Sequence, residues 1–180
     1  MKSVNILLLV FMSAFCLLAQ QKAVHFKKLQ EFLPAKEIQG WQRSKPTGST
    51  NTIAGMATSV ATVQYEEKSV SENQLTPLKS MEISITDVSF TPFVLMAFNM
   101  LQGYESETEN GYEKGLTIKE RFKGKVEVRT ESENKSVDLQ LAIGECFLLT
   151  IHLDGSDDFT FIEKILDEMN LSALSELKSE

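Results

Sequence analysis

The chain has 180 residues and a formal net charge of −7 at neutral pH, and 42% of its residues are hydrophobic. A chain this acidic is an unfavourable partner for nucleic acid, because the phosphates repel it and no run of basic residues offsets the charge. For the same reason, no attraction to an anionic membrane surface is expected.

The N-terminal residues are typical of a secretory signal peptide. Lys2 precedes the apolar run ILLLVFMSAFCLLA, and the polar residues QQK follow it. The run has 14 residues, whereas a helix that crosses a bilayer needs about 20. We therefore predict that residues 1–19 are a signal peptide cleaved after Ala19, and that the protein is exported to the periplasm or the extracellular space. No stable transmembrane anchor is expected after cleavage.

The cysteines cannot form a disulfide bond within the mature protein. Cys16 lies within the predicted signal peptide, and Phe15 before it is larger than the small residue that lipoprotein processing requires. We expect Cys16 to be discarded with the signal peptide and not lipidated. Only Cys146 then remains, which excludes an intramolecular disulfide. Residues 20–180 suffice for a single α+β domain with its own core.

The first half of the mature chain predicts one helix, a loop and two strands. Residues 23–33 carry apolar side chains on one side and are predicted to form a helix that Pro34 ends. Residues 35–55, rich in Gly, Ser and Thr, are predicted to form a loop. Alternating side chains predict strands at ATSVATVQY and MEISI, paired antiparallel across the polar loop EEKSVSENQLTP.

The second half predicts a four-stranded antiparallel meander. Alternation runs through residues 116–122, 126–131, 137–143 and 146–153, with turns at Lys123-Gly124 and Gly144-Glu145. The segment YESETENGYEKG before these strands is predicted to be an acidic, solvated loop. Charged and amide side chains fill every second position of the strands, so one face of the sheet is wet. We expect a two-layer α+β fold: an antiparallel sheet of about six strands, with helices packed on one face.

The chain closes with a predicted amphipathic helix. Ser156 is expected to be its N-cap, and Asn170 to end it. The segment LSALSEL then offers a further apolar edge. The helix carries one apolar stripe, formed by Phe159, Ile162, Ile165, Leu166 and Met169.

The stretch TPFVLMAFNMLQG, from Thr91 to Gly103, predicts a helix over residues 92–102 that is apolar on every side. Such a helix is normally buried, and this one is too short to span a bilayer. Three interpretations stay open: the sheet and the other helices cover it, it lines a pocket for an apolar ligand, or a protein partner covers an exposed patch. The candidate ligand-binding residues are Phe93, Met96, Phe98, Met100 and, at the rim of such a pocket, Trp41, which otherwise covers the surface.

The sequence predicts no catalytic site, metal site or cofactor. Cys146 and His152 lie about 20 Å apart along one strand, too far for a nucleophile and its base. With His25 as the second histidine, a zinc site cannot be assembled without carboxylates. The carboxylates of DGSDD, from Asp154, fit a turn and a helix cap better than a cation site.

The order of segments carries a resemblance. The chain resembles a group of small exported bacterial proteins of unknown function. The resemblance lies in the order of its segments: "FLP…GW", ATSVATVQYEE, EISITDVS, the apolar helix, NGYEKGLTIKERFKGKVEV, ECFLLTIHLDG and the capped helix. At the level of fold they are similar to the PsbP/Mog1-like and LolA-like families, which have antiparallel sheets with helices on one side. The LolA-like resemblance implies an acyl chain bound between a curved sheet and apolar helices, a role that would fall to residues 92–102.

We therefore expect an exported, non-enzymatic protein that acts by binding in the cell envelope. One alternative is a carrier of lipid or another apolar small molecule in a pocket beside the 92–102 helix. The other is an accessory subunit of an envelope protein complex, with the wet sheet face or LSALSEL as the contact.

Overall fold

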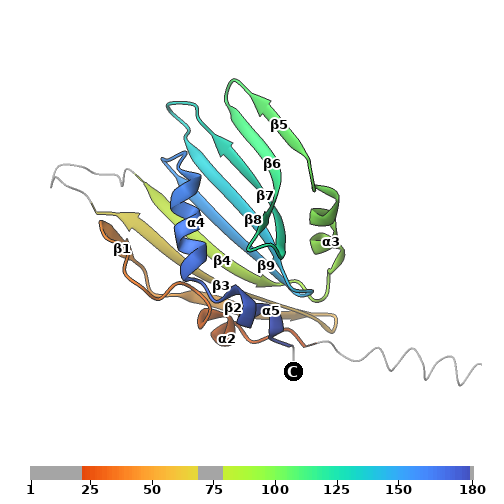
Figure 1. Cartoon of the computed structure of the whole chain (residues 1–180). Helices are drawn as coiled ribbons and strands as arrows, with labels where there is room; N and C mark the ends of the chain where they lie inside the picture. Colours follow the sequence, from red (N-terminus) through yellow and green to blue (C-terminus); the bar gives the residue numbers. More distant parts are fainter. Residues whose placement is uncertain (1–21, 69–78, 179–180) are drawn as a thin grey trace, which may run out of the picture.

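A computed structural model of the chain describes residues 22–68 and 79–178. The predicted signal peptide, residues 1–19, and most of the predicted polar loop at 66–77 lie outside the described residues. Nine strands and four helices are present in the described part of the chain (Figure 1). The strands are β1 (Trp41–Arg43), β2 (Thr47–Ile53), β3 (Met56–Glu67), β4 (Ser80–Asp87), β5 (Glu105–Thr108), β6 (Gly111–Ile118), β7 (Phe122–Arg129), β8 (Ser136–Ile143) and β9 (Phe147–Asp154). The helices are α2 (Phe26–Gln30), α3 (Phe93–Met100), α4 (Phe159–Glu168) and α5 (Leu171–Glu176).

The strands form one antiparallel sheet in the order β1-β3-β4-β9-β8-β7-β6-β5, and β2 pairs with β3. The predicted α+β class is thus confirmed. The predicted β3–β4 pair and the C-terminal meander, β6 to β9, are also confirmed. The predicted size is wrong, because the sheet has nine strands and not about six.

The additional strands come from segments predicted to be loops. β1 and β2 lie within residues 35–55, and β5 lies within the predicted acidic loop. β2 has the sequence TGSTNTI, which is mostly exposed and lacks the alternation of a half-buried strand. It pairs with β3 through a two-residue turn, Ala54-Gly55, in which both residues have positive φ, 53° and 83°.

The turn between β6 and β7 lies earlier than predicted. Lys119 and Glu120 adopt positive φ values of 51° and 56°, and the Arg121 N–H donates to the Ile118 carbonyl oxygen at 3.1 Å. Gly124 therefore lies inside β7 and serves a packing role. A β carbon at this position would lie 2.0 Å from the carbonyl oxygen of Gln140 on β8.

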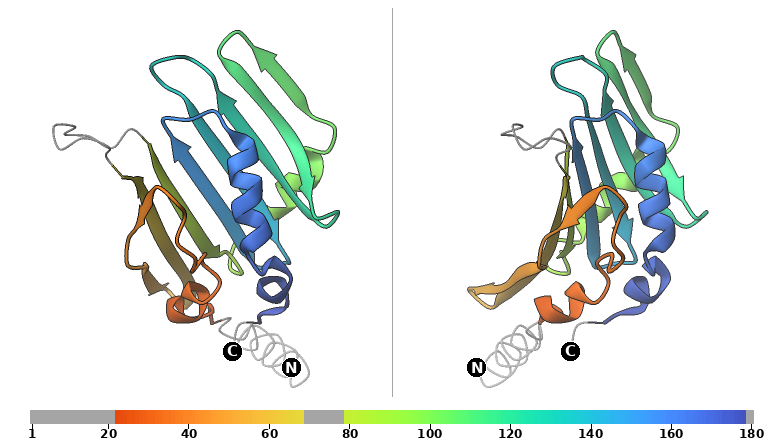
Figure 2. Two further views of the ribbon diagram at one scale, coloured as in Figure 1. Left: turned by 60° about the vertical axis from the view of Figure 1, so that its left-hand side comes forward. Right: turned by 90° about the vertical axis from the view of Figure 1, so that its left-hand side faces the viewer.

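One face of the sheet, here called the core face, is apolar from β3 to β7. A single transverse row across it contains buried residues from five neighbouring strands in register: Val63, Ile83, Ile151, Leu139 and Val126. Helices α2, α4 and α5 pack against this face (Figure 2).

Helix α4 buries the predicted stripe, since Ile162, Ile165, Leu166 and Met169 are all covered. Its N-cap is Asp158 and not the predicted Ser156. The Asp158 carboxylate accepts from the Phe161 N–H at 3.1 Å.

The N-terminal helix is shorter than predicted and covers only Phe26–Gln30, because the chain before it is extended. Its apolar side is confirmed by the burial of Leu29 and Leu33. Tyr65 lies under the chain that follows, where its hydroxyl donates to the Pro34 carbonyl oxygen at 3.0 Å. Burial raises the pKa of the Tyr65 hydroxyl above its ordinary value.

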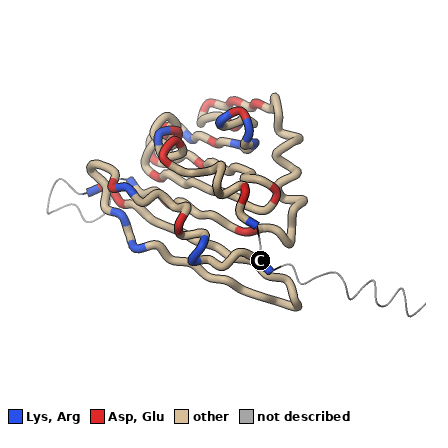
Figure 3. Tube along the Cα trace, turned by 60° about the horizontal axis from the view of Figure 1, so that its bottom comes forward, with Lys and Arg blue, Asp and Glu red and all other residues tan. Residues whose placement is uncertain are grey.

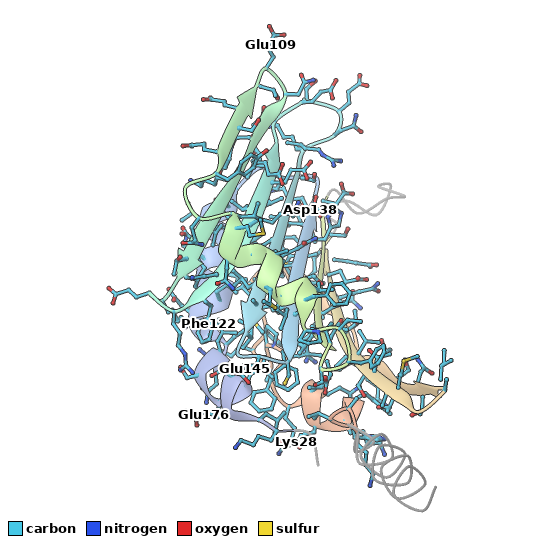
Figure 4. The ribbon with its side chains drawn as sticks, turned by 90° about the vertical axis from the view of Figure 1, so that its right-hand side faces the viewer. Lys28, Glu109, Phe122, Asp138, Glu145 and Glu176 are labelled. Carbon is cyan, nitrogen blue, oxygen red and sulfur yellow. The ribbon has the colours of Figure 1, made fainter. Side chains whose placement is uncertain are left out.

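Helix α3 lies on the opposite face of the sheet, so the prediction that the helices pack on one face is wrong. It contacts β7 and β8. The residues beneath it, Gly115, Lys123 and Ala142, alternate with side chains of the core face. Figure 4 shows α3 in front of the sheet, with α4 and α5 behind it. We call this second face the polar face.

Candidate functional site

Helix α3 is covered on one side only. Leu95 and Phe98 are 6% and 5% exposed and face the sheet. Phe93, Met96 and Met100 are 68%, 65% and 86% exposed. These three residues are spaced i, i+3 and i+7, so they form one apolar stripe along the helix, here called the α3 stripe. Of the three interpretations of this helix, complete burial in the core is therefore wrong.

The C-terminal end of α3 is fixed to the sheet by close backbone contact. The Gly115 N–H donates to the Tyr104 carbonyl oxygen at 2.9 Å. A β carbon at Gly115 would lie 1.7 Å from the carbonyl oxygen of Leu101, so only glycine allows this approach. The Lys123 ammonium also donates to the Asn99 side-chain oxygen at 3.0 Å. The position of the α3 stripe is thus set by β6 and β7.

The segment that leads into α3 is held by a buried carboxylate. Asp87 ends β4 and is fully buried. Its Oδ2 accepts from the Val24 N–H at 2.7 Å, and its Oδ1 accepts from the N–H and the hydroxyl of Ser89. Its carbonyl oxygen accepts from the Thr58 hydroxyl at 2.9 Å. Asp87 therefore joins the N-terminal segment, β3 and the start of the α3 segment at one point.

A groove of about 440 Å³ lies between α3 and the ends of β7 and β8. Phe122 and Glu145, two of its lining residues, are labelled beside α3 in Figure 4. The groove is mixed in character, because apolar side chains from α3 meet charged residues of the two strand ends. Its lining is Pro92, Leu95, Met96, Asn99, Arg121, Phe122, Lys123, Ala142, Gly144 and Glu145.

The exposed large hydrophobic residues of the described chain are concentrated in two uncharged segments. Residues 46–65 contain the tip of the β2–β3 hairpin, and residues 88–104 contain α3; neither has a charged residue. In Figure 3 the hairpin tip and the α3 segment lie at the right-hand edge of the tube, which is uncharged. The seven exposed residues are Ile53, Met56, Phe90, Phe93, Met96, Met100 and Tyr104.

The hairpin tip and the α3 stripe lie on the same face of the sheet. Met56 alternates along β3 with Ala57 and Ser59, which are buried on the core face. Ile53 pairs with Met56 across the hairpin and shares its face. Two regions far apart in sequence thus expose apolar side chains on the polar face.

The structure separates the candidate binding residues predicted from sequence. Phe93, Met96 and Met100 lie together on the exposed side of α3, whereas Phe98 packs against the sheet. Trp41 lies on the core face, where its ring stacks on Phe161 of α4 with centroids 5.4 Å apart. Sequence reasoning missed Phe90, Ile53 and Met56, although the absence of charge around each was a usable signal.

The remainder of the polar face carries charged side chains, several of which form hydrogen bonds or ion pairs with one another. One transverse row holds Glu82, His152, Asp138, Glu127 and Glu113 in register. The His152 Nδ1 lies 2.7 Å from the Asp138 carboxylate. At the β5 end of the row, Lys125 donates to Glu113 at 2.9 Å, and this hydrogen bond raises the pKa of Lys125. A polar hollow of about 710 Å³ overlies this region. The predicted wet face is confirmed here.

Within the described part of the chain, we recognise no catalytic set of side chains on the polar face. The described residues give His152 one side-chain hydrogen bond, to Asp138, and no hydroxyl or thiol partner. Cys146 is free, half-buried and packed against the core cluster. No group of three or more His, Cys, Asp and Glu side chains within residues 22–68 and 79–178 is arranged to hold a metal ion.

Two further observations bear on the site. Within the described part of the chain, none of the helices has the length and apolar character needed to span a membrane. Comparison of the chain with protein-family models, with curated proteins and with solved structures finds no match. The resemblance to PsbP/Mog1-like and LolA-like proteins stays a prediction, and function is argued below from the site itself.

Proposed function

We propose that this protein is an exported, non-enzymatic binding protein of the cell envelope, and that the α3 stripe is its binding surface. The observation that carries the proposal is the exposure of Phe93, Met96 and Met100 on a helix that is firmly seated on the sheet. Isolated apolar residues are common on protein surfaces, but clustered large ones mark interaction sites.

The chemistry of the stripe suits binding. Methionine side chains are flexible and adapt to partners of varied shape, and phenylalanine provides a large apolar area. The sheet holds the helix in place through Gly115 and Lys123, so little ordering is needed before binding. A rigid support beneath an adaptable apolar surface is what a binding site of this kind requires.

Photo-crosslinking in the native envelope tests this function. p-Benzoylphenylalanine placed at Met100 lies on the stripe, whereas the same probe at Asn134 lies on the exposed loop before β8. We expect irradiation to give an adduct from position 100 and none from position 134, and the mass of the adduct to identify the bound species. The proposal fails if position 100 gives no adduct, or if both positions give the same adducts in the same yield.

A second candidate function is a carrier of a lipid or another apolar small molecule. The groove beside α3 supports it, because its volume of about 440 Å³ is within the range of about 300–1,000 Å³ usual for ligand sites. Charged residues at the strand ends make this groove less apolar than the stripe. An adduct of small-molecule mass from position 100 would identify a lipid or another apolar small molecule as the bound species, whereas a protein adduct would favour an accessory subunit of an envelope complex.

A further inference from the structure

We propose that the bound species is a lipid bilayer surface of low charge, on which the protein docks through two elements at once. The first element is α3 with Phe90, and the second is the tip of the β2–β3 hairpin. Together, Ile53, Met56, Phe90, Phe93, Met96 and Met100 form what is here called the apolar rim. This inference deepens the proposed function and rests on it.

The arrangement of the two elements favours a bilayer over a single protein groove. Residues 51–56 at the hairpin tip are all exposed, as are the outward residues of α3. The two elements are separated in sequence by β3, β4 and the segment between them, yet both expose apolar side chains on the polar face. Two short apolar insertions from separate parts of the fold are suited to a soft, extended surface.

The two elements suit shallow contact through their side chains. The hairpin pairs internally from Thr47 with Thr62 to Ile53 with Met56, and in the described chain the outer edge of β2 has no strand partner. Helix α3 has no side-chain cap at its N-terminus, so the protein does not bond all of its first N–H groups. Because unpaired backbone groups cannot enter hydrocarbon, only the apolar side chains would do so, while the backbone stays at the level of water and lipid headgroups. Neither element carries a charged side chain that would resist insertion.

The length of α3 limits its insertion to the bilayer surface. Its eight residues extend about 12 Å, far less than the roughly 30 Å of the hydrocarbon core. Interfacial helices that bind anionic lipid carry Lys and Arg, whereas residues 88–104 carry none and the chain has a net charge of −7. The fitting partner is therefore a zwitterionic surface.

Vesicle flotation tests the inference with the protein purified from its own envelope, in the form that the cell makes. We expect it to float with phosphatidylcholine vesicles, and to float less as phosphatidylglycerol replaces part of the lipid. The double substitution Phe93→Ser with Met100→Ser should weaken partition at least about tenfold, and so should Ile53→Ser with Met56→Ser. The matched control, Asn110→Ser with Asn134→Ser, changes exposed residues elsewhere and should float like the wild type.

The outcomes separate this inference from the proposed function. Thermal unfolding first confirms that the variants are folded, as expected for exposed sites. If the wild type does not float with phosphatidylcholine, or if both rim variants float as well as the control, the bilayer proposal is overturned. A protein adduct from position 100 together with absent flotation would leave the binding function standing. Absence of both the adduct and the flotation would refute the binding function and the bilayer proposal together.

Discussion

Replacing Asp87 by alanine is expected to lower the free energy of unfolding by at least about 3 kcal/mol. The carboxylate is fully buried and accepts from the Val24 N–H and from the N–H and hydroxyl of Ser89. Each buried donor left without a partner costs roughly 1–3 kcal/mol. Alanine removes the acceptor of all three donors, so their costs add to a large loss.

Urea unfolding followed by Trp41 fluorescence measures this loss. The matched control is Asp154→Ala, because Asp154 is an exposed aspartate at the end of β9, and a change within about 0.5 kcal/mol is expected there. Asp87→Asn keeps one oxygen acceptor and should fall between the two. Equal stability of Asp87→Ala and Asp154→Ala would show that the carboxylate does not hold these segments together.

Replacing Gly115 by alanine is expected to displace the end of α3 and to lower the free energy of unfolding by about 1–3 kcal/mol. The added β carbon would lie 1.7 Å from the Leu101 carbonyl oxygen and 2.6 Å from its carbonyl carbon. Both are backbone atoms, so the helix end must move away from β6. Alanine is otherwise better suited than glycine to a strand interior, so intrinsic propensity cannot explain a loss.

Hydrogen exchange locates the effect of this substitution. The amides from Phe98 to Tyr104 should exchange faster in Gly115→Ala, whereas the amides of β8 and β9 should change less. Thr117→Ala is the control, because it lies on the same face of β6 and removes one hydrogen bond, to Gln102, without a clash. Unchanged stability and protection in Gly115→Ala would contradict the packing of α3 described above.

The parts of the fold that alternate strongly could be predicted from the sequence. The core-face residues of β3, β4 and the meander are apolar at every second position, and their pairing followed from the turns between them. β2 and β5 could not be predicted in this way, because they are exposed and polar on both faces. These two strands are stabilised by pairing with β3 and β6. The signal for them therefore lies in the sequence of the partner strand and not in their own.

Glycine was misleading in one hairpin. Gly124 suggested a turn, but Lys119 and Glu120 adopt the positive φ values, and Gly124 makes room for β8. The same distinction applies at Gly115, whose role depends on a helix that arrives from a different part of the chain. Close approach between distant segments leaves no mark in the local pattern.

The candidate site shows the clearest limit of sequence reasoning. Leu95 and Phe98 are buried while Phe93, Met96 and Met100 are exposed, yet all five are large and apolar. Hydrophobicity along the helix therefore carried no information about which side meets the sheet. The composition did predict an unusual helix, and its partial exposure emerged only from the position of α3 on the polar face.

Methionine oxidation footprinting tests most directly whether the α3 stripe is occupied in its native setting. Met96 and Met100 are exposed in the isolated protein, whereas Met81 and Met169 are buried and serve as internal controls. The protein is treated with dilute peroxide in its native envelope and again after purification. We predict that Met96 and Met100 oxidise slowly in the envelope and rapidly once purified, while Met81 and Met169 oxidise slowly in both. Equal rapid oxidation of Met96 and Met100 in the two states would contradict a binding role for the stripe.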